Sequence, residues 1–376
     1  MPLEIARMRR EFLVNRLDQL RRNLDKDTMV GVEIGPFFNP VAPKADGWNT
    51  TVIDYQDGET LRKIARKHSD RGIRSKVNVI EDVDIVWHGQ PLDKVTLQRN
   101  PDGYDFFIAS HVIEHTPDIL RFLQQCSRVL KPDGIVSLAV PDMRKCFDLL
   151  KSPTSVREIL TAYRERRVRH TPEALFEARA WATTRDGKTA WVRGNHLPIG
   201  FAHSFGSALK GYKSDVRRVG KAHPYIDAHT WFFTPASFEL AILQLNQIGF
   251  LDLNIAWLEE NHGSEFIVQM RHAEEPGTIP REKFDAERIR LALKHHAEFD
   301  SEVGPSYREI PPIPEPERMI VEVPVEVRVE VPVEVRVEVP VEVFVPVEPP
   351  IESTVDLAKR LALRIHRKIM SLVGLV

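Results

Sequence analysis

The amino-acid sequence predicts an α/β fold in which a doubly wound, mostly parallel sheet of seven strands is covered by helices. Short apolar runs of strand length alternate along the chain with stretches whose apolar residues recur at helical spacing. Strands that alternate with helices favour a parallel sheet with helices on both faces. The alternation breaks once, after Pro141, and resumes near residue 231, which indicates an insertion.

The seven expected strands are short and apolar. They occupy residues 30–34, 51–54, 84–87, 104–110, 135–140, 251–258 and 265–270. The turn Lys131–Gly134 is expected to precede the fifth strand. Helical spacing is found at 4–24, 59–67 and 118–130. A further helix is expected to begin at Pro235, with Thr234 as its N-cap, and to end before Gly249.

Residues 144–230 form the insertion that follows the fifth strand. They are rich in Arg, His, Trp and Gly, with helical pieces at 155–167 and 172–182 and no clear strand alternation. In open α/β sheets, ligands bind outside the carboxyl ends of the strands, where such an insertion lies. We therefore expect an α-rich substrate lid.

The C-terminal tail is an extended segment of low complexity. From Val321 it repeats VEVPVEVR with a period of eight residues, and the recurring proline removes hydrogen-bond donors that a strand would need. We expect a stiff spacer, followed at 356–372 by a short helix with an apolar stripe and flanking basic residues. That composition is typical of a helix lying on an anionic membrane surface. The alternative is a helix that docks on a partner protein or on a second copy.

Composition excludes several classes of protein. Lys plus Arg (52) nearly balances Asp plus Glu (54), so a basic nucleic-acid footprint is not expected. Two cysteines cannot staple 376 residues, which favours a reducing compartment. No apolar run is long enough to span a membrane, and the charged N-terminus does not resemble a signal peptide. We expect a cytoplasmic protein, peripheral at the inner face of the cytoplasmic membrane if the tail helix binds lipid.

The strongest chemical signal is the stretch Glu33–Pro40 together with Asp54. A glycine turn after the first strand, with an acid about 20 residues further on, is the arrangement that binds an adenosine-type cofactor, because the acid accepts hydrogen bonds from ribose hydroxyls. A dinucleotide site needs two more glycines for its pyrophosphate, and their places are taken by Phe37 and Pro40. NAD is therefore disfavoured.

The stretch Glu33–Pro40 resembles motif I of class I S-adenosylmethionine-dependent methyltransferases, in the variant form E-I-G-P-x-x-N-P. Three more stretches resemble a type 11-like branch of that superfamily. They are YDFFIASHVIEH at 104–115, LAVPDMR at 138–144 and HTWFFTP at 229–235. The resemblance covers about 30–272 and leaves the tail unexplained. It implies a Rossmann-like sheet, S-adenosyl-L-methionine as cofactor, and a place in bacterial surface-polysaccharide biosynthesis.

The resemblance also assigns cofactor contacts by position. The residues expected in the cofactor pocket are Glu33, Gly35, Pro36, Asp54, His88 and Ser110. Glu33 and Gly35 would hold the methionine end and Asp54 the ribose. The family's adenine contact falls in 87–92, where this sequence offers His88. An ordinary strand-end turn is the alternative for Glu33 and Gly35, and a turn or capping aspartate for Asp54.

The segment His111–His115 also matches H-x-x-E-H, a zinc signature of metallopeptidases that requires a helix. Pro117 leaves barely a turn and a half of helix, so no metal is expected. The resemblance instead places His111 at the carboxyl end of the fourth strand, beside the sulfonium. There it would orient the substrate or take a proton. The alternative is a structural histidine that closes the loop.

O-methylation of a sugar benefits from a general base, because a hydroxyl is a poor nucleophile. Among the histidines of the insertion, His229 is the best candidate, since it lies where the insertion re-enters the fold. It adjoins Trp231 and Phe232, which could stack on a sugar face. Glu265, which opens the last strand, is a weaker candidate. The predicted catalytic residues are therefore His229 and His111.

These expectations combine into a methyltransferase (EC 2.1.1.-) that O-methylates a saccharide or a glycan-related acceptor, with glycosyltransferases as partners and no nucleic acid. The alternative is a methyltransferase-like scaffold or membrane-tethered assembly partner without turnover. The expected organisation is an N-terminal helix (1–27), a cofactor-binding domain (28–143 and 231–272), the insertion or lid (144–230), a helical and linker segment (273–318), the repeat spacer (319–350) and a basic amphipathic helix (351–376).

Overall fold

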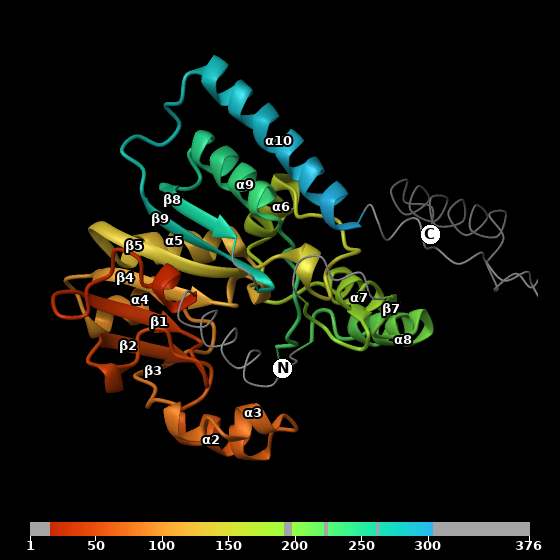
Figure 1. Ribbon diagram of the computed structural model, residues 1–376, viewed down its shortest axis with the longest axis horizontal. Helices are drawn as coiled ribbons and strands as arrows, with labels where there is room; N and C mark the ends of the chain where they lie inside the picture. The colour runs from red at the N-terminus through yellow and green to blue at the C-terminus, as the bar shows by residue number, and fades with distance from the viewer. Residues whose placement is uncertain (1–15, 192–197, 222–224, 261–262, 304–376) are drawn as a thin grey trace, which may run out of the picture. The chain divides into compact units, whose positions relative to one another are not determined.

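The central sheet of the protein has seven strands in the order β3-β2-β1-β4-β5-β9-β8 (Figure 1). The structure is a computed structural model that describes residues 16–191, 198–221, 225–260 and 263–303. The strands from β1 to β5 pair in parallel, whereas β9 pairs antiparallel with both β5 and β8. The doubly wound, mostly parallel fold predicted from the sequence is therefore confirmed. The strands are β1 Val30–Ile34, β2 Asn49–Asp54, β3 Ile85–Val86, β4 Tyr104–Ser110, β5 Leu130–Pro141, β8 Leu253–Glu260 and β9 Glu265–His272.

The helices begin where the sequence supplies capping residues. The N-cap side chains of six described helices accept a backbone N–H from three residues further on, which satisfies one donor of the first turn. These N-caps are Asp57, Asp118, Ser155, Thr171, Ser204 and Thr234. The helices of the sheet layers are α2 Gly58–Lys67, α3 Arg71–Arg74, α4 Leu92–Arg99, α5 Ile119–Val129, α9 Pro235–Gln247 and α10 Arg281–Val303. Figure 1 shows α10 running alongside α9, which it contacts.

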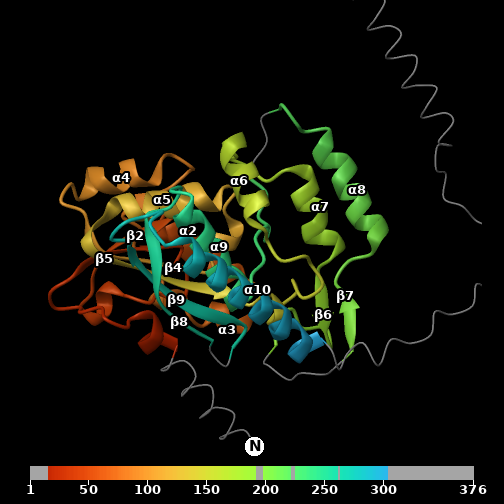
Figure 2. The ribbon, with the colours of Figure 1, turned by 90° about the horizontal axis from the view of Figure 1, so that it is seen from above.

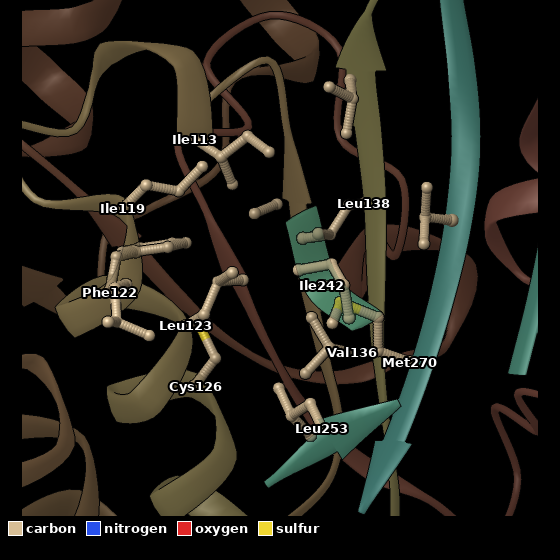
Figure 3. Packing of buried hydrophobic residues seen from close by; sticks show 14 of the residues in the cluster. Ile113, Ile119, Phe122, Leu123, Cys126, Val136, Leu138, Ile242, Leu253 and Met270 are labelled. Atoms are coloured by element: carbon tan, nitrogen blue, oxygen red, sulfur yellow. The ribbon is translucent and has the colours of Figure 1, made fainter. Parts of the chain in front are cut away.

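Two apolar clusters cover the two faces of the sheet. Along β4, Phe107 and Ala109 belong to one cluster and Phe106 and Ile108 to the other, as expected because successive strand residues point to opposite faces. The larger cluster joins β4 and β5 to α5 and α9, and Figure 3 shows part of its packing. The smaller cluster contains residues of the 41–48 segment and of the helical stretch at 16–20.

The insertion between β5 and α9 carries helices and one small sheet. Its elements are α6 Val156–Glu165, α7 Pro172–Ala180, β6 Thr183–Arg185, β7 Ile199–Phe201 and α8 Phe205–Val216. Both views place α7, α8, β6 and β7 together beside the central sheet (Figures 1 and 2). The sequence analysis missed the antiparallel β6–β7 pair, because strands of three residues are too short to show an alternation.

Two other expectations are modified by the structure. The predicted turn Lys131–Gly134 lies within β5, where Tyr104 pairs with Leu130 but Phe106 pairs with Ile135, so the segment bulges from the strand instead of preceding it. The predicted helix at 4–24 is described only from residue 16, and residues 16–20 are helical. The tail segments 319–350 and 351–376 lie outside the described residues. No helix in the described part of the chain is long and apolar enough to cross a membrane.

Candidate active site

The carboxyl ends of β1, β2 and β4 meet at one edge of the sheet. Ile34 at the end of β1 pairs with Ile53 of β2 on one side and with Ala109 of β4 on the other. The strand order reverses between β1 and β4, and ligands of open α/β sheets bind in the crevice at this switch point. The predicted cofactor residues Gly35, Asp54 and Ser110 follow or end these strands, so the fold brings them together.

The turn after β1 requires a glycine. Gly35 has a φ of +67°, which costs an L side chain strain, and its N–H donates to the Ile53 carbonyl at 2.8 Å. A Cβ on Gly35 would lie 3.3 Å from Cγ2 of Val112, so the turn packs against the segment after β4. Pro36 continues the turn, and residues 35–48 contain no α-helix, only the 3₁₀ turn Lys44–Asp46. The helix N-terminus that binds a pyrophosphate is thus missing here, in line with the argument against NAD.

Glu33 lies beneath this turn and is 1% exposed. Its Oε1 accepts the Val41 N–H at 2.6 Å and its Oε2 accepts the Ala42 N–H at 2.9 Å. Burial raises the pKa of Glu33 to about 7, against the lowering effect of the two amides. Glu33 therefore fixes the loop that returns toward β2, and its contact with the methionine end of a cofactor stays a prediction.

Asp54 ends β2 and is 4% exposed. Its Oδ1 accepts the Tyr55 N–H at 2.7 Å, whereas its buried Oδ2 has no hydrogen-bond partner among the described residues. Burial raises the pKa of Asp54 to about 6, partly opposed by the amides of Tyr55 and Phe37. A buried acceptor without a donor is costly unless a ligand supplies one. The ribose hydroxyls of an adenosine-type cofactor are suitable donors, so the residues present fit S-adenosylmethionine.

The segment that was expected near the adenine follows β3. The Trp87 N–H donates to the Asp54 carbonyl at 2.8 Å, which keeps this segment beside the end of β2. His88 is exposed, and its N–H donates to Oε1 of Gln90 at 2.8 Å. His88 therefore lies on the surface near the end of β2, and its contact with the adenine stays a prediction.

A charged network closes the site beside β4. Glu265 opens β9 opposite Pro141, the last residue of β5, and so reaches the same edge. Its carboxylate accepts Arg16 Nε at 2.5 Å and His111 Nε2 at 2.6 Å. Arg16 also donates to the Ser110 hydroxyl at 2.6 Å, which gives Ser110 a partner within the protein.

The carboxylates around His111 control its protonation. Burial lowers the pKa of His111, but the neighbouring carboxylates of Glu114 and Glu265 outweigh this and raise it to about 10. Burial raises the pKa of Glu265. His111 and Arg16 outweigh this effect and lower that pKa to about 2. His111 is therefore an imidazolium near neutral pH in this structure. An imidazolium donates hydrogen bonds and can orient a substrate; the other role expected from the sequence, taking a proton, requires that His111 first lose its own.

Glu114 lies at the centre of three histidines. It is 1% exposed, and its Oε1 is 3.5 Å from His111 Nδ1, 3.6 Å from His115 Nε2 and 3.9 Å from His229 Nε2. Burial raises the pKa of Glu114, but the three imidazoles outweigh it and hold that pKa below its usual value. The two predicted catalytic histidines, His111 and His229, are thus both brought within 4 Å of one carboxylate oxygen.

His229, near the end of the insertion, is held by Asp148, near its start. Its Nδ1 donates to Asp148 Oδ2 at 2.7 Å, and Asp148 also accepts Lys151 Nζ at 2.6 Å. Burial raises the pKa of Asp148, but His229 and Lys151 together lower it to about 2, so the carboxylate is ionised. Nε2 is the nitrogen of His229 that faces the cluster. The neighbouring His115 has its Nδ1 2.8 Å from Asp227 Oδ1.

The expected sugar-stacking role of Trp231 and Phe232 is wrong. Trp231 is 5% exposed and Phe232 is 3% exposed, because both rings pack inside the protein. The indole N–H of Trp231 donates to the Thr116 carbonyl, and the Lys151 ammonium covers the Phe232 ring. Their aromatic faces therefore contact other groups of the protein and are not available to stack on a sugar.

Sequence reasoning missed several residues of the site. Arg16, Asp148 and Asp227 reach it from the N-terminal helical stretch and from the two ends of the insertion. None of them stands in a motif with fixed spacing. Arg16 lies on the polar side of a predicted amphipathic helix, where an arginine usually indicates only solvent exposure.

The sheet order, the positive-φ glycine turn and the buried acid at the end of β2 define a protein that binds an adenosine-type cofactor. Residues 6–184 match the model of a family described as a methyltransferase domain. The fold and this match support a class I S-adenosylmethionine-dependent methyltransferase, with S-adenosylmethionine as the cofactor.

Solved structures with similar folds include methyltransferases, all at low identity. Mitomycin 7-O-methyltransferase MmcR is 13% identical with a TM-score of 0.31, over 69% of this chain and 53% of its own. The CcbJ methyltransferase from Streptomyces caelestis is 12% identical with a TM-score of 0.36, over 69% and 89%. The O-methyltransferase NcsB1, solved with S-adenosylmethionine, is 11% identical with a TM-score of 0.30, over 69% and 56%. This chain spans about half of the first of these, and no curated protein matches it. Such low similarity transfers no substrate to this chain.

Proposed function

We propose that this protein transfers the methyl group of S-adenosylmethionine to a hydroxyl of a saccharide or glycan-related acceptor used in bacterial surface-polysaccharide biosynthesis. The observation that carries the methyltransferase assignment is the buried Oδ2 of Asp54, which has no hydrogen-bond partner among the described residues and lies beside the positive-φ turn at Gly35. The acceptor class rests on the sequence resemblance at 104–115, 138–144 and 229–235. Glycosyltransferases are the proposed partners, and 351–376 is the proposed membrane contact.

S-adenosylmethionine supplies a methyl group bound to a positively charged sulfur, a good leaving group. The protein then has to hold the acceptor oxygen in line with that sulfur, because positioning lowers the barrier of a displacement. Asp54 binds the ribose, and Glu33 shapes the turn around the methionine end. Ser110 and the imidazolium of His111 border the place where the acceptor meets the methyl group.

We propose that His229 activates the acceptor hydroxyl through Nε2. Asp148 accepts a hydrogen bond from Nδ1–H, which fixes the ring and directs Nε2, with its lone pair, to the acceptor. This nitrogen acts as the general base predicted from the sequence. Hydrogen-bonding partners on the other ring nitrogen are a general means of orienting a catalytic histidine.

The proposed function is tested by calorimetry on the full chain with S-adenosylmethionine, its demethylated product and NAD. We expect binding of the first two and none of NAD, and weaker binding by Asp54→Asn. The matched control is Asp102→Asn, which changes an exposed aspartate. Methyl transfer to sugar nucleotides and lipid-linked saccharides is then measured with labelled cofactor. Binding of NAD alone would contradict the assignment, and cofactor binding without turnover on any acceptor would favour the scaffold alternative.

A further inference from the structure

We propose that Glu114, His115 and His229 form a binding site for one divalent metal ion with a preference for nitrogen ligands, such as Zn²⁺ or Co²⁺. The site stands on its own geometry, and only its use in activating the acceptor rests on the proposed function. Two imidazoles and one carboxylate are a common donor set for such ions.

The three side chains already face one another. Each offers one ligand atom, and these atoms all lie within 4.8 Å of one another. From Glu114 Oε1, the distance is 3.6 Å to His115 Nε2 and 3.9 Å to His229 Nε2. Ligand atoms around a tetrahedral zinc ion lie roughly 3.3 Å apart, given bonds of about 2.0–2.1 Å. Side-chain movements of up to about 1 Å would therefore close the site on an ion.

Carboxylates outside the cluster aim both histidines at the site. Asp148 Oδ2 holds Nδ1 of His229 at 2.7 Å, and Asp227 Oδ1 lies 2.8 Å from Nδ1 of His115. In each ring Nε2 is the nitrogen that faces Glu114. Histidines that bind metals typically donate their other N–H to a carboxylate, which fixes the ring and raises its basicity. His229 shows this hydrogen-bonded arrangement, and at His115 the Asp227 carboxylate lies within ion-pair distance of the corresponding nitrogen.

Glu114 supplies a second, independent observation. Its side chain is 1% exposed, and neither carboxylate oxygen has a hydrogen-bond partner among the described residues. A buried carboxylate is normally satisfied by hydrogen bonds, by a counter-ion or by a metal. His111 Nδ1 lies 3.5 Å from Glu114 Oε1, and the other ring nitrogen of His111 is engaged by Glu265. A metal ion at the cluster would satisfy Glu114 directly.

The site differs from a zinc peptidase, although Glu114 and His115 belong to the H-x-x-E-H stretch. Ile113–His115 is a 3₁₀ turn, so His111 and His115 do not share the face of an α-helix. His111 Nε2 is engaged by Glu265 instead. The third ligand, His229, comes from the far end of the insertion. The sequence analysis expected no metal because it considered the short stretch alone.

Three protein ligands leave an open position for the acceptor oxygen. A metal ion there would lower the pKa of the acceptor hydroxyl, whose proton would pass to water. The C–O bond then forms as the C–S bond of the cofactor breaks, and S-adenosylhomocysteine leaves. In the metal-loaded protein the lone pair of His229 Nε2 is on the metal, so His229 acts as a ligand and not as the base.

The test uses the full chain after dialysis against a chelator. Titration with Co²⁺ followed by visible absorption, and with Zn²⁺ by calorimetry, should show one ion per chain. Glu114→Gln, His115→Ala and His229→Ala should each weaken binding at least tenfold, and Asp227→Asn by about 10–100-fold. His203→Ala, which changes an exposed histidine, is the control and should bind as the wild type does. Circular dichroism checks folding, and the exposed Asp227 remains testable if Glu114→Gln does not fold.

Absence of stoichiometric binding would overturn the metal site, as would equal binding by the wild type and all four site variants. If the protein methylates at full rate after chelation, the metal has no part in acceptor activation and His229 is the base, while the proposed function stands. If the metal binds as described but S-adenosylmethionine does not, the proposed function fails and the metal site stands.

Discussion

Asp148 and His229 are joined by a hydrogen bond of 2.7 Å although they are 81 positions apart in the sequence. Asp148 follows β5 closely and His229 precedes α9, so this bond ties the two ends of the insertion together. It also places His229 Nε2 3.9 Å from Glu114, which follows β4. The position of the proposed catalytic histidine therefore depends on the insertion being correctly closed on the sheet.

Substitution of Asp54 tests the cofactor site. Asp54→Ala removes a charged acceptor of ribose hydrogen bonds and should weaken S-adenosylmethionine binding by about 1–3 kcal/mol. Calorimetry measures the change, and circular dichroism confirms that the fold is kept. Unchanged affinity would show that the cofactor does not contact the end of β2.

Cofactor affinity should depend on pH through Asp54. Its pKa in the free protein is raised to about 6 by burial, and only the ionised form accepts both ribose hydrogen bonds. Affinity is thus fully present from about one unit above this pKa, is about halved at the pKa, and is lost by about tenfold at a pH one unit below it. Calorimetry across this range checks the slope. Asp54→Asn should bind weakly and without this pH dependence; an unchanged slope in that variant would assign the titration to another group.

Substitution of His229 tests acceptor activation. His229→Ala should lower turnover by about 10²–10⁴-fold, whether the residue serves as base or as metal ligand. Asp148→Asn should lower kcat with a smaller change in the acceptor KM, because Asp148 orients His229 without touching the acceptor. Steady-state kinetics separate the two parameters. Full activity of His229→Ala would exclude the residue from catalysis.

Two glycine substitutions test the packing of β1. A Cβ on Gly31 would lie 1.9–2.2 Å from ring atoms of Phe106, so Gly31→Ala should lower the free energy of unfolding by about 3 kcal/mol or more through overpacking. Gly206 in α8 has open space around its Cβ position. Gly206→Ala should therefore stabilise the protein by about 0.5–1 kcal/mol. Denaturant unfolding measures both; equal stability of the two variants would contradict the packing described.

Deletion of residues 351–376 tests the proposed membrane contact. The full chain should sediment with anionic vesicles but not with neutral ones, and salt should weaken the binding, because each basic residue near the surface adds about 1 kcal/mol. The truncated chain should stay in solution. Equal sedimentation of both chains would point to the alternative, in which the tail docks on a protein.

Local patterns predicted the sheet well and the site only in part. The bounds 104–110 for β4 and the Thr234 cap of α9 follow from neighbouring residues alone, so sequence reasoning found both. The cluster around Glu114 joins segments that are far apart in the chain, and no periodicity encodes such a meeting. The aromatics Trp231 and Phe232 were misjudged because an aromatic residue in a core and one in a sugar site look the same in a sequence.

The hydrogen bonds that join the two ends of the insertion have a consequence for experiments that exchange this part of the chain. Asp142 forms a β-bridge with Phe233, and Thr154 and Phe232 exchange two further hydrogen bonds at 2.8 and 2.9 Å. The two segments by which the chain leaves and re-enters the sheet are thus hydrogen-bonded to each other. Helices α7 and α8 and the β6–β7 pair lie beyond them. We expect that 168–221 can be replaced by a corresponding segment from a related protein without unfolding the sheet, because α6 stays in place and keeps Ile159 and Ala162 in the larger apolar cluster. Since His111 and His229 lie outside such a graft, the exchange would separate the contribution of the insertion to acceptor choice from that of the sheet.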